Sequence, residues 1–148
     1  MPEEEAIERA REDEREGKSP STQAGEFVRE EMEHIREGEH GARSPEQAIA
    51  IGLSKARRAG LKLPPPRRGK ARTKRQAKRD LTKGRAVRKK PSTKRSRATK
   101  RALKRESRRS ASKRALSRHS RLAASRRSAR SRSAAAKKAA RTRKRRRR

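Results

Sequence analysis

Apolar residues recur at helical spacing in two stretches of the chain, and both lie within the first 63 residues. In the first, residues 19–38, a proline follows Ser19 and a glycine stands at position 38, which are typical start and stop signals of a helix. The pattern predicts an amphipathic helix, although Glu31 interrupts its apolar stripe. The stripe consists of Ala24, Phe27, Val28, Met32 and Ile35.

The second stretch, residues 43–60, has clear helix boundaries. Residues 44–47 read Ser-Pro-Glu-Gln, a capping box with proline at the first helical position, and Gly60 is expected to end the helix. Ala48, Gly52 and Ala56 are small and four residues apart, so a partner helix could approach closely along this face. The stripe of residues 19–38 is the natural partner, and we predict that the two segments form an antiparallel helical hairpin.

Residues 2–17 predict a further helix, which is polar nearly all round. It starts at Pro2 and ends near Gly17, and its many glutamates interleave with arginines. Pairs such as Glu5 with Arg9, four residues apart, stabilise a helix by only about 0.2–0.5 kcal/mol each. We interpret this segment as a solvated acidic arm; the alternative is that it folds back on the basic part of the chain and competes with nucleic acid.

The candidate core of residues 1–63 is small. A core drawn from about 60 residues is marginal in stability, and self-association would supply further burial. The residues that would carry such a contact are Phe27, Val28, Ile35, Ile49 and Leu53. The full set of core candidates is Ile7, Phe27, Val28, Met32, Ile35, Ile49, Ile51, Leu53, Leu61 and Leu63.

Charge and composition divide the chain at the three prolines of residues 64–66, which cannot continue a helix and favour a stiff spacer. Residues 1–63 contain 15 acidic and 11 basic residues, a net charge of −4. Residues 64–148 contain 2 acidic and 39 basic residues, a net charge of +37. We therefore predict a small helical head (1–63), a polyproline boundary (64–66) and a basic tail (67–148).

The basic tail is of low complexity, and Arg, Lys, Ser, Ala and Thr dominate it. Residues 100–108 (KRALKRESR) and 113–121 (KRALSRHSR) form a loose repeat. Ala, Arg and Lys favour helix, but like charges repel along it, so we expect the tail to be intrinsically disordered until its charge is neutralised. The predicted fold class is mostly α, with a helical-hairpin or three-helix head and a disordered or conditionally helical tail.

The charge of the basic tail favours nucleic acid as its partner. Duplex DNA carries one charge per about 1.7 Å of axis, so 39 positive charges match roughly 66 Å of duplex. The tail has 26 Arg, 13 Lys and no aromatic residue, which favours the phosphate backbone of a duplex over stacking on single-stranded bases. RNA stays an alternative, because its phosphates attract the same cations. The predicted binding residues are Arg67, Arg68, Lys70, Arg72, Lys74, Arg75, Lys78, Arg79, Lys89, Lys90, Arg101, Lys104, Arg105, Arg108, Arg109, Lys113, Arg114, Arg118, Arg126, Arg127, Lys137, Lys138, Arg141, Arg143, Lys144, Arg145, Arg146, Arg147 and Arg148.

No feature of the sequence indicates an enzyme. The chain contains no cysteine, no glycine-rich phosphate loop and no nucleophile motif. His34 and His40 stand among glutamates, where a metal site can be pictured, but we interpret them as a solvated pair and expect no metal and no cofactor. The acidic start and the lack of a long apolar run argue against a signal peptide and a membrane span, so we expect an intracellular protein.

Residues 47–57, QAIAIGLSKAR, and more loosely residues 27–41, resemble an uncharacterised family of small basic bacterial proteins with a QAIAIALSEAR-like helix. Their tails are similar to those of bacterial linker-histone-like proteins, which implies a nucleoid-associated role, although the arginine-rich tail here is closer to protamine-like compaction. We therefore expect a histone-like, cytoplasmic nucleoid protein that binds and compacts DNA without sequence specificity. The alternatives are an RNA- or ribosome-associated factor and a partner-docking protein that its tail localises.

Overall fold

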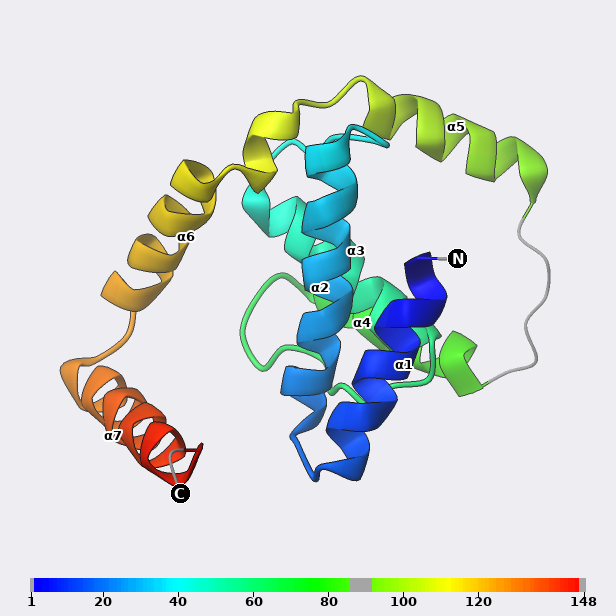
Figure 1. The fold of residues 1–148 in the computed structure, drawn as a ribbon. Helices are drawn as coiled ribbons and strands as arrows, with labels where there is room; N and C mark the ends of the chain where they lie inside the picture. The colour runs from blue at the N-terminus through cyan, green and yellow to red at the C-terminus, as the bar shows by residue number, and fades with distance from the viewer. Residues whose placement is uncertain (1, 86–91, 147–148) are drawn as a thin grey trace. The chain divides into compact units, whose positions relative to one another are not determined.

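The structure, a computed structural model, describes residues 2–85 and 92–146 of the 148-residue chain. The predicted binding residues Lys89, Lys90, Arg147 and Arg148 lie outside the described residues, as does the side chain of Arg146. Within the described ranges the chain forms seven α-helices, one 3-10 helix and no strand (Figure 1), which confirms the predicted mostly-α class. The chain divides into two compact units, Met1–Ser112 and Lys113–Arg148.

The first three helices follow the pattern of the sequence closely, and the predicted cap of the third is present. The Ser44 side chain accepts a hydrogen bond from Gln47 N at 3.3 Å. Gln47 Oε1 accepts in turn from Arg43 N at 2.8 Å, one residue earlier than in the usual capping box. The helices are α1 (Pro2–Arg15), α2 (Pro20–Glu37) and α3 (Pro45–Arg58).

Glycine ends α3 as expected. Gly60 has a φ of +103°, in the left-handed region that glycine adopts without strain. Its N–H donates to Arg57 O at 3.1 Å, and Leu61 N donates to Ala56 O at 3.2 Å, so the last carbonyls of the helix are paired. The same arrangement follows α2, where Gly38 has a φ of +88°.

α2 and α3 pack against each other along the small-residue face of α3, as the sequence predicts. Ala48 and Ala56 are completely buried. Gly52 lies so close to α2 that an added Cβ would stand 2.7 Å from Val28 Cα and 3.0 Å from Phe27 O. The pairing of the two helices is therefore confirmed, and Gly52 marks their closest approach.

The main core cluster of the first unit is built largely from alanine. It contains Phe27 and Leu63 of the predicted core, and Ile7, Leu53 and Leu61 pack partly buried against it. Met32 and Ile35 are buried as well, whereas Val28, Ile49 and Ile51 are half-buried. Ala24 and Ala56, which the sequence pattern places on the apolar faces of their helices, also belong to the cluster, and Ala6 and Ala10 of α1 complete it.

Burial in this core corrects the predicted surface for self-association. Phe27 is 1% exposed and Ile35 is 0% exposed, so neither can contact a second copy while the unit stays folded. The reason is that α1 and α3 already cover the apolar side of α2. Val28, Ile49 and Leu53 keep part of their surface, and self-association through these three residues stays a prediction.

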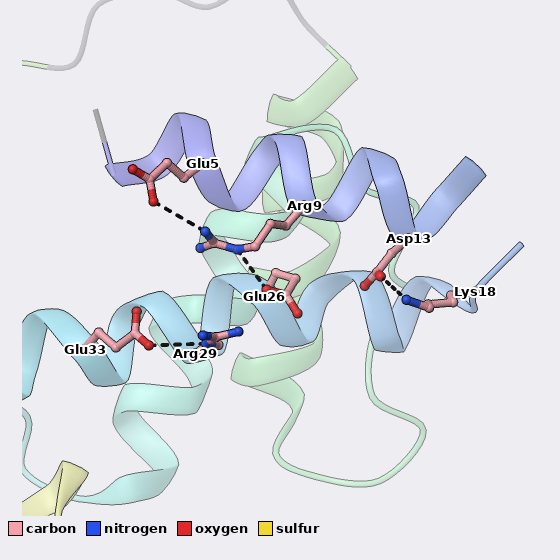
Figure 2. A network of polar contacts seen from close by, with 7 residues as sticks. All are labelled: Glu5, Arg9, Asp13, Lys18, Glu26, Arg29 and Glu33. Carbon is pink, nitrogen blue, oxygen red and sulfur yellow. Dashed lines mark hydrogen bonds and ion pairs between the residues drawn. The ribbon is translucent and has the colours of Figure 1, made fainter. Parts of the chain in front are cut away.

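α1 packs against α2 and does not project as the solvated arm that its polarity suggests. Ala6 and Ala10 supply its buried side. Figure 2 shows the polar contacts that α1 makes: Arg9 donates to Glu5 Oε2 within α1 at 3.4 Å and to Glu26 Oε2 of α2 at 3.0 Å. Desolvation lowers the pKa of the Arg9 guanidinium, but the hydrogen bonds to the two glutamates outweigh it and raise the pKa.

The compact part of the first unit continues past the prolines of residues 64–66. α4 (Ala71–Arg85) begins five residues beyond Pro66 and packs against α3. α5 (Thr93–Lys104) follows, and the 3-10 helix η1 (Arg108–Ala111) contacts both α2 and α3. The proline run thus lies inside the first unit, which extends to Ser112.

The long irregular tail that we expected is not seen in the described residues. Within the predicted tail, α4 and α5 belong to the first unit, and the second unit contains α6 (Lys113–Ser125) and α7 (Ala129–Arg146). Alanine, arginine and lysine have high helix propensity, and each like-charge pair on an exposed helix costs only a few tenths of a kcal/mol because the long side chains spread into water. In the described part of the chain, no helix is long and apolar enough to cross a membrane.

Candidate nucleic-acid interface

The predicted cations lie on the surface of the structure. All those with described side chains are exposed except Lys74, which is half-buried. Within the described ranges, none of them pairs with a carboxylate, since the ion pairs there join head cations to acidic residues. The two acidic residues of the basic tail, Asp80 and Glu106, face Arg58 and Arg43 of the head. The predicted cations that the structure describes are therefore not neutralised by carboxylates of the described residues.

α4 carries the clearest basic surface. Ala77 and Asp80 are buried at 3% and 2% exposure and mark the side that faces α3. The opposite side presents exposed cations at spacings of three and four residues, which places them in one row along the helix. This α4 basic face spans about 17 Å, at about 1.5 Å per residue, and Lys83 extends it beyond the predicted residues. It consists of Arg72, Arg75, Arg79 and Lys83.

The buried carboxylate of Asp80 fixes the rotation of α4. Ser54 Oγ of α3 donates to its Oδ2 at 2.8 Å, and Gln76 Nε2 donates to its Oδ1 at 3.1 Å. Arg58 Nε lies 4.0 Å from Oδ1 and adds a longer-range attraction. Because Asp80 points toward α3, the cations on the other side of α4 are turned toward solvent.

Arg57 is a cation that the structure uses for folding. Its Nε donates to Leu63 O at 3.2 Å and its Nη2 to Pro64 O at 3.3 Å, which ties the chain after α3 back onto the helix. Burial lowers the pKa of the Arg57 guanidinium, and the charge of Asp80 opposes that shift. Gly84 of α4 lies against Arg57 O, where a Cβ would not fit. Arg57 therefore belongs to the scaffold of the α4 basic face.

A second anchor holds the chain from the end of α5 through η1 against the end of α2 and the loop that follows it. Gly41 N donates to Leu103 O at 2.9 Å, and Ala42 N donates to Ser107 O at 3.1 Å. Arg36 Nε donates to Ala111 O at 3.0 Å. These contacts order a segment whose cations all remain exposed: Lys104, Arg105, Arg108 and Arg109.

In the second unit, cations lie on two solvated helices. On α6, Arg114, Arg118 and Arg121 repeat at four and three residues and share one side of the helix. α7 is 18 residues long, about 27 Å, and carries an alanine-rich centre between clusters of cations. Its exposed predicted cations are Lys137, Lys138, Arg141, Arg143, Lys144 and Arg145.

The remaining predicted residues are distributed between these elements and do not form one continuous site. Three of them precede α4. Lys74 and Lys78 lie on α4 beside its basic face, and Arg101 lies on α5. Lys113 begins α6, and two more lie in the loop between α6 and α7. The three before α4 are Arg67, Arg68 and Lys70, and the two in the later loop are Arg126 and Arg127.

The interpretation of His34 and His40 as a solvated pair is wrong. His34 is 7% exposed, and the His40 side chain is only 16% exposed. Together with the fully buried Glu31, they bring one carboxylate and two imidazoles within 4.8 Å of one another. The signal in the sequence was the glutamate that interrupts the apolar stripe, but the burial of His34 depends on contacts that helical spacing does not reveal.

Residues 17–68 are similar to a family of unknown function (DUF6496), and no curated protein and no solved structure matches the chain. The matched segment contains α2, α3 and the proline run, and it ends just before α4. Residues 17–68, which contain α2 and α3, thus resemble an uncharacterised family, as the sequence indicated.

Proposed function

We propose that this protein binds nucleic acid without sequence specificity, with duplex DNA as its ligand, and acts as a histone-like, nucleoid-associated protein that compacts DNA. The observation that carries the proposal is the division of charge. The tail holds 39 basic residues, and its two acidic residues point at the head. Cations that are not paired with protein carboxylates are available to neutralise phosphates. Each phosphate neutralised in this way releases counterions of the duplex, which favours binding.

The α4 basic face supports a duplex as the ligand. Its cations stand on a helix whose rotation Asp80 fixes, so part of their arrangement is set before binding. Arginine pairs with phosphate oxygens through two parallel hydrogen bonds, and three of the four residues of this face are arginines. The chain has no Tyr or Trp and one Phe, which is buried, so it has no exposed Phe, Tyr or Trp in the described residues to stack on unpaired bases.

The test is the salt dependence of binding by the full-length protein to a fluorescent duplex of about 20 base pairs. If about ten phosphates are engaged, the slope of log K against log salt is about −9. Replacing Arg72, Arg75, Arg79 and Lys83 together by alanine removes four contacts. The slope should then fall in magnitude by about 3.6, since each contact contributes about 0.9.

A matched control removes the same net charge from the head. Its four substitutions, at exposed cations outside the proposed interface, are Arg11→Ala, Arg15→Ala, Arg29→Ala and Lys62→Ala. We expect this control to change the slope by less than one. Equal effects of the two variants would show that only net charge matters and would contradict the α4 basic face. Absence of duplex binding at low salt would contradict the proposed function.

Competition with a structured RNA hairpin separates the RNA-associated alternative. Equal or tighter binding to the hairpin at every salt concentration would overturn the preference for DNA. Substitutions are preferable to deletion of residues 67–148, because α4 and the residues around η1 contribute contacts that hold the head together. If the α4 variant still binds duplex with an unchanged slope, the α4 basic face does not contact the duplex and other cations carry the binding.

A further inference from the structure

The C-terminal end of α2 contains a cluster of groups that the nucleic-acid proposal does not use. Glu31 and His34 are three residues apart and share one side of α2, and His40 follows in the loop after Gly38. Glu31 is 0% exposed, and one ligand atom from each of the three residues lies within 4.8 Å of the others. Removing two imidazoles and a carboxylate from water costs free energy, which hydrogen bonds, ion pairs or a bound ion must offset.

The His34 ring has one nitrogen without a partner. Nδ1 lies 4.0 Å from Glu39 Oε2, whereas Nε2 is buried and forms no hydrogen bond with the described residues. Leaving a buried polar atom unpaired costs about 1–3 kcal/mol. Histidines that bind metal typically direct their other ring nitrogen at a carboxylate or a carbonyl, which orients the ring. Glu39 stands in that position relative to His34.

The His40 ring is oriented in a similar way. Nδ1 lies 3.2 Å from Gly41 O, and because a carbonyl oxygen only accepts, this hydrogen bond places a proton on Nδ1. In the neutral ring, Nε2 then carries a lone pair, and it lies 3.4 Å from Glu31 Oε1, which is also an acceptor. Two acceptors that face each other require a cation between them, either a proton on the ring or a metal ion.

Glu31 is the anionic member of the cluster. Its carboxylate is buried, and neither oxygen accepts a hydrogen bond from the described residues. Lys55 Nζ of α3 lies 3.1 Å from Oε2 and compensates part of the charge, while Oε1 faces His40. The Lys55 ammonium stands on a flexible stem and can move away from an incoming cation.

We propose that Glu31, His34 and His40 bind one Zn²⁺ ion, through a carboxylate oxygen of Glu31 and the Nε2 atoms of both histidines. Two imidazoles and a carboxylate are a known ligand set for zinc, with a fourth position left for water, whereas magnesium prefers oxygen ligands alone. Ligand atoms about 2.0–2.1 Å from a tetrahedral zinc are about 3.3 Å apart. His40 Nε2 and Glu31 Oε1 already lie 3.4 Å apart, and rotation of the His34 side chain completes the set.

Bound zinc would fix the loop after α2. His40 precedes Gly41 and Ala42, whose N–H groups donate to Leu103 O in the last turn of α5 and to Ser107 O just before η1. Fixing His40 to two residues of α2 therefore also fixes the loop that this basic segment contacts. None of the three ligands belongs to the proposed interface, so zinc binding can be measured without nucleic acid.

The experiment is titration of the full-length protein with Zn²⁺ by isothermal calorimetry, together with Co²⁺ as a spectroscopic substitute. We expect one equivalent of Zn²⁺, a rise in Tm on binding, and the intense visible bands of tetrahedral Co²⁺. His34→Gln and His40→Gln should each weaken binding at least tenfold. The matched control is His119→Gln on α6, which should leave affinity unchanged. Absence of binding, or affinity that neither of the first two substitutions changes, would overturn the proposal.

A measurement on the unmodified protein covers the case in which a variant does not fold. The ring nitrogens of the three histidines are followed by long-range ¹H–¹⁵N spectra during addition of Zn²⁺. The proposal requires that the Nε2 signals of His34 and His40 move together while the ring of His119 does not. Movement of His119 alone, or of none of the three rings, contradicts it.

Discussion

The contact at Gly52 gives the sharpest prediction for stability, because the chain supplies a matched control. Both Gly25 in α2 and Gly52 in α3 lie inside a helix, and neither has positive φ. An added Cβ at Gly25 meets nothing within 4 Å, whereas at Gly52 it meets Val28 Cα at 2.7 Å. Substituting alanine at each position therefore separates helix propensity from the closeness of the two helices.

The expected magnitudes follow from these distances. Gly25→Ala should stabilise the protein by about 0.8–1 kcal/mol, the difference in helix propensity. Gly52→Ala gains the same amount, but the new carbon lies about 1 Å inside the usual carbon–carbon separation of about 3.5–4.0 Å, so α2 and α3 must move apart. Overpacking of this kind costs about 1–3 kcal/mol. The two variants should differ by about that amount, with Gly52→Ala the less stable.

The assay is thermal and urea unfolding followed by far-ultraviolet circular dichroism, because the chain has no Trp or Tyr to report by fluorescence. For a unit of this size, about 1 kcal/mol corresponds to a shift of about 4 °C in Tm. Gly25→Ala should therefore melt about 4–12 °C above Gly52→Ala. If both substitutions raise Tm equally, α3 does not approach α2 at Gly52 and the packing described above is incorrect.

Three further predictions concern single residues. Asp80→Ala should destabilise the first unit by about 1.5–3 kcal/mol in urea unfolding, because the Ser54 hydroxyl loses a charged acceptor; an unchanged midpoint would contradict the anchoring of α4. Ser44→Ala should cost about 1 kcal/mol and Ser44→Asp should restore most of it, since both Ser and Asp cap a helix; equal losses would mean that the cap contributes nothing. Lys55→Met should strengthen Zn²⁺ binding about tenfold or more, by removing a positive charge beside Glu31, and weaker binding in calorimetry would contradict the proposed ligand set.

The sequence predicts the parts of the fold that depend on local signals. The cap at Ser44, the glycine after each of the first three helices and the small-residue face of α3 all lie within a few turns of the residues they affect. Their physical effects act over a few residues, so spacing alone locates them. For this reason α2, α3 and their pairing follow from the pattern of the chain.

The remainder of the fold depends on contacts between residues far apart in the chain. Asp80 is one of two acidic residues in a basic tail, and its bond to Ser54 crosses 26 positions. His34 appears polar and exposed when only α2 is considered, yet it is buried in the folded unit. The candidate cations could be predicted individually from charge. Their arrangement in a row on α4 required knowing which side of that helix faces α3.

The hydrogen bond between Arg36 and Ala111 crosses 75 positions, and it has a consequence for the order of events during synthesis. At roughly 5–20 residues per second, a ribosome needs about 4–15 s to extend the chain from one residue to the other. Local helices form in microseconds, so α2 and α3 can pair long before η1 exists. During that interval the C-terminal turn of α2 lacks the contact that η1 later makes. The nascent chain therefore passes through a stage in which its first helices are paired and this end of α2 is still open to solvent and solutes.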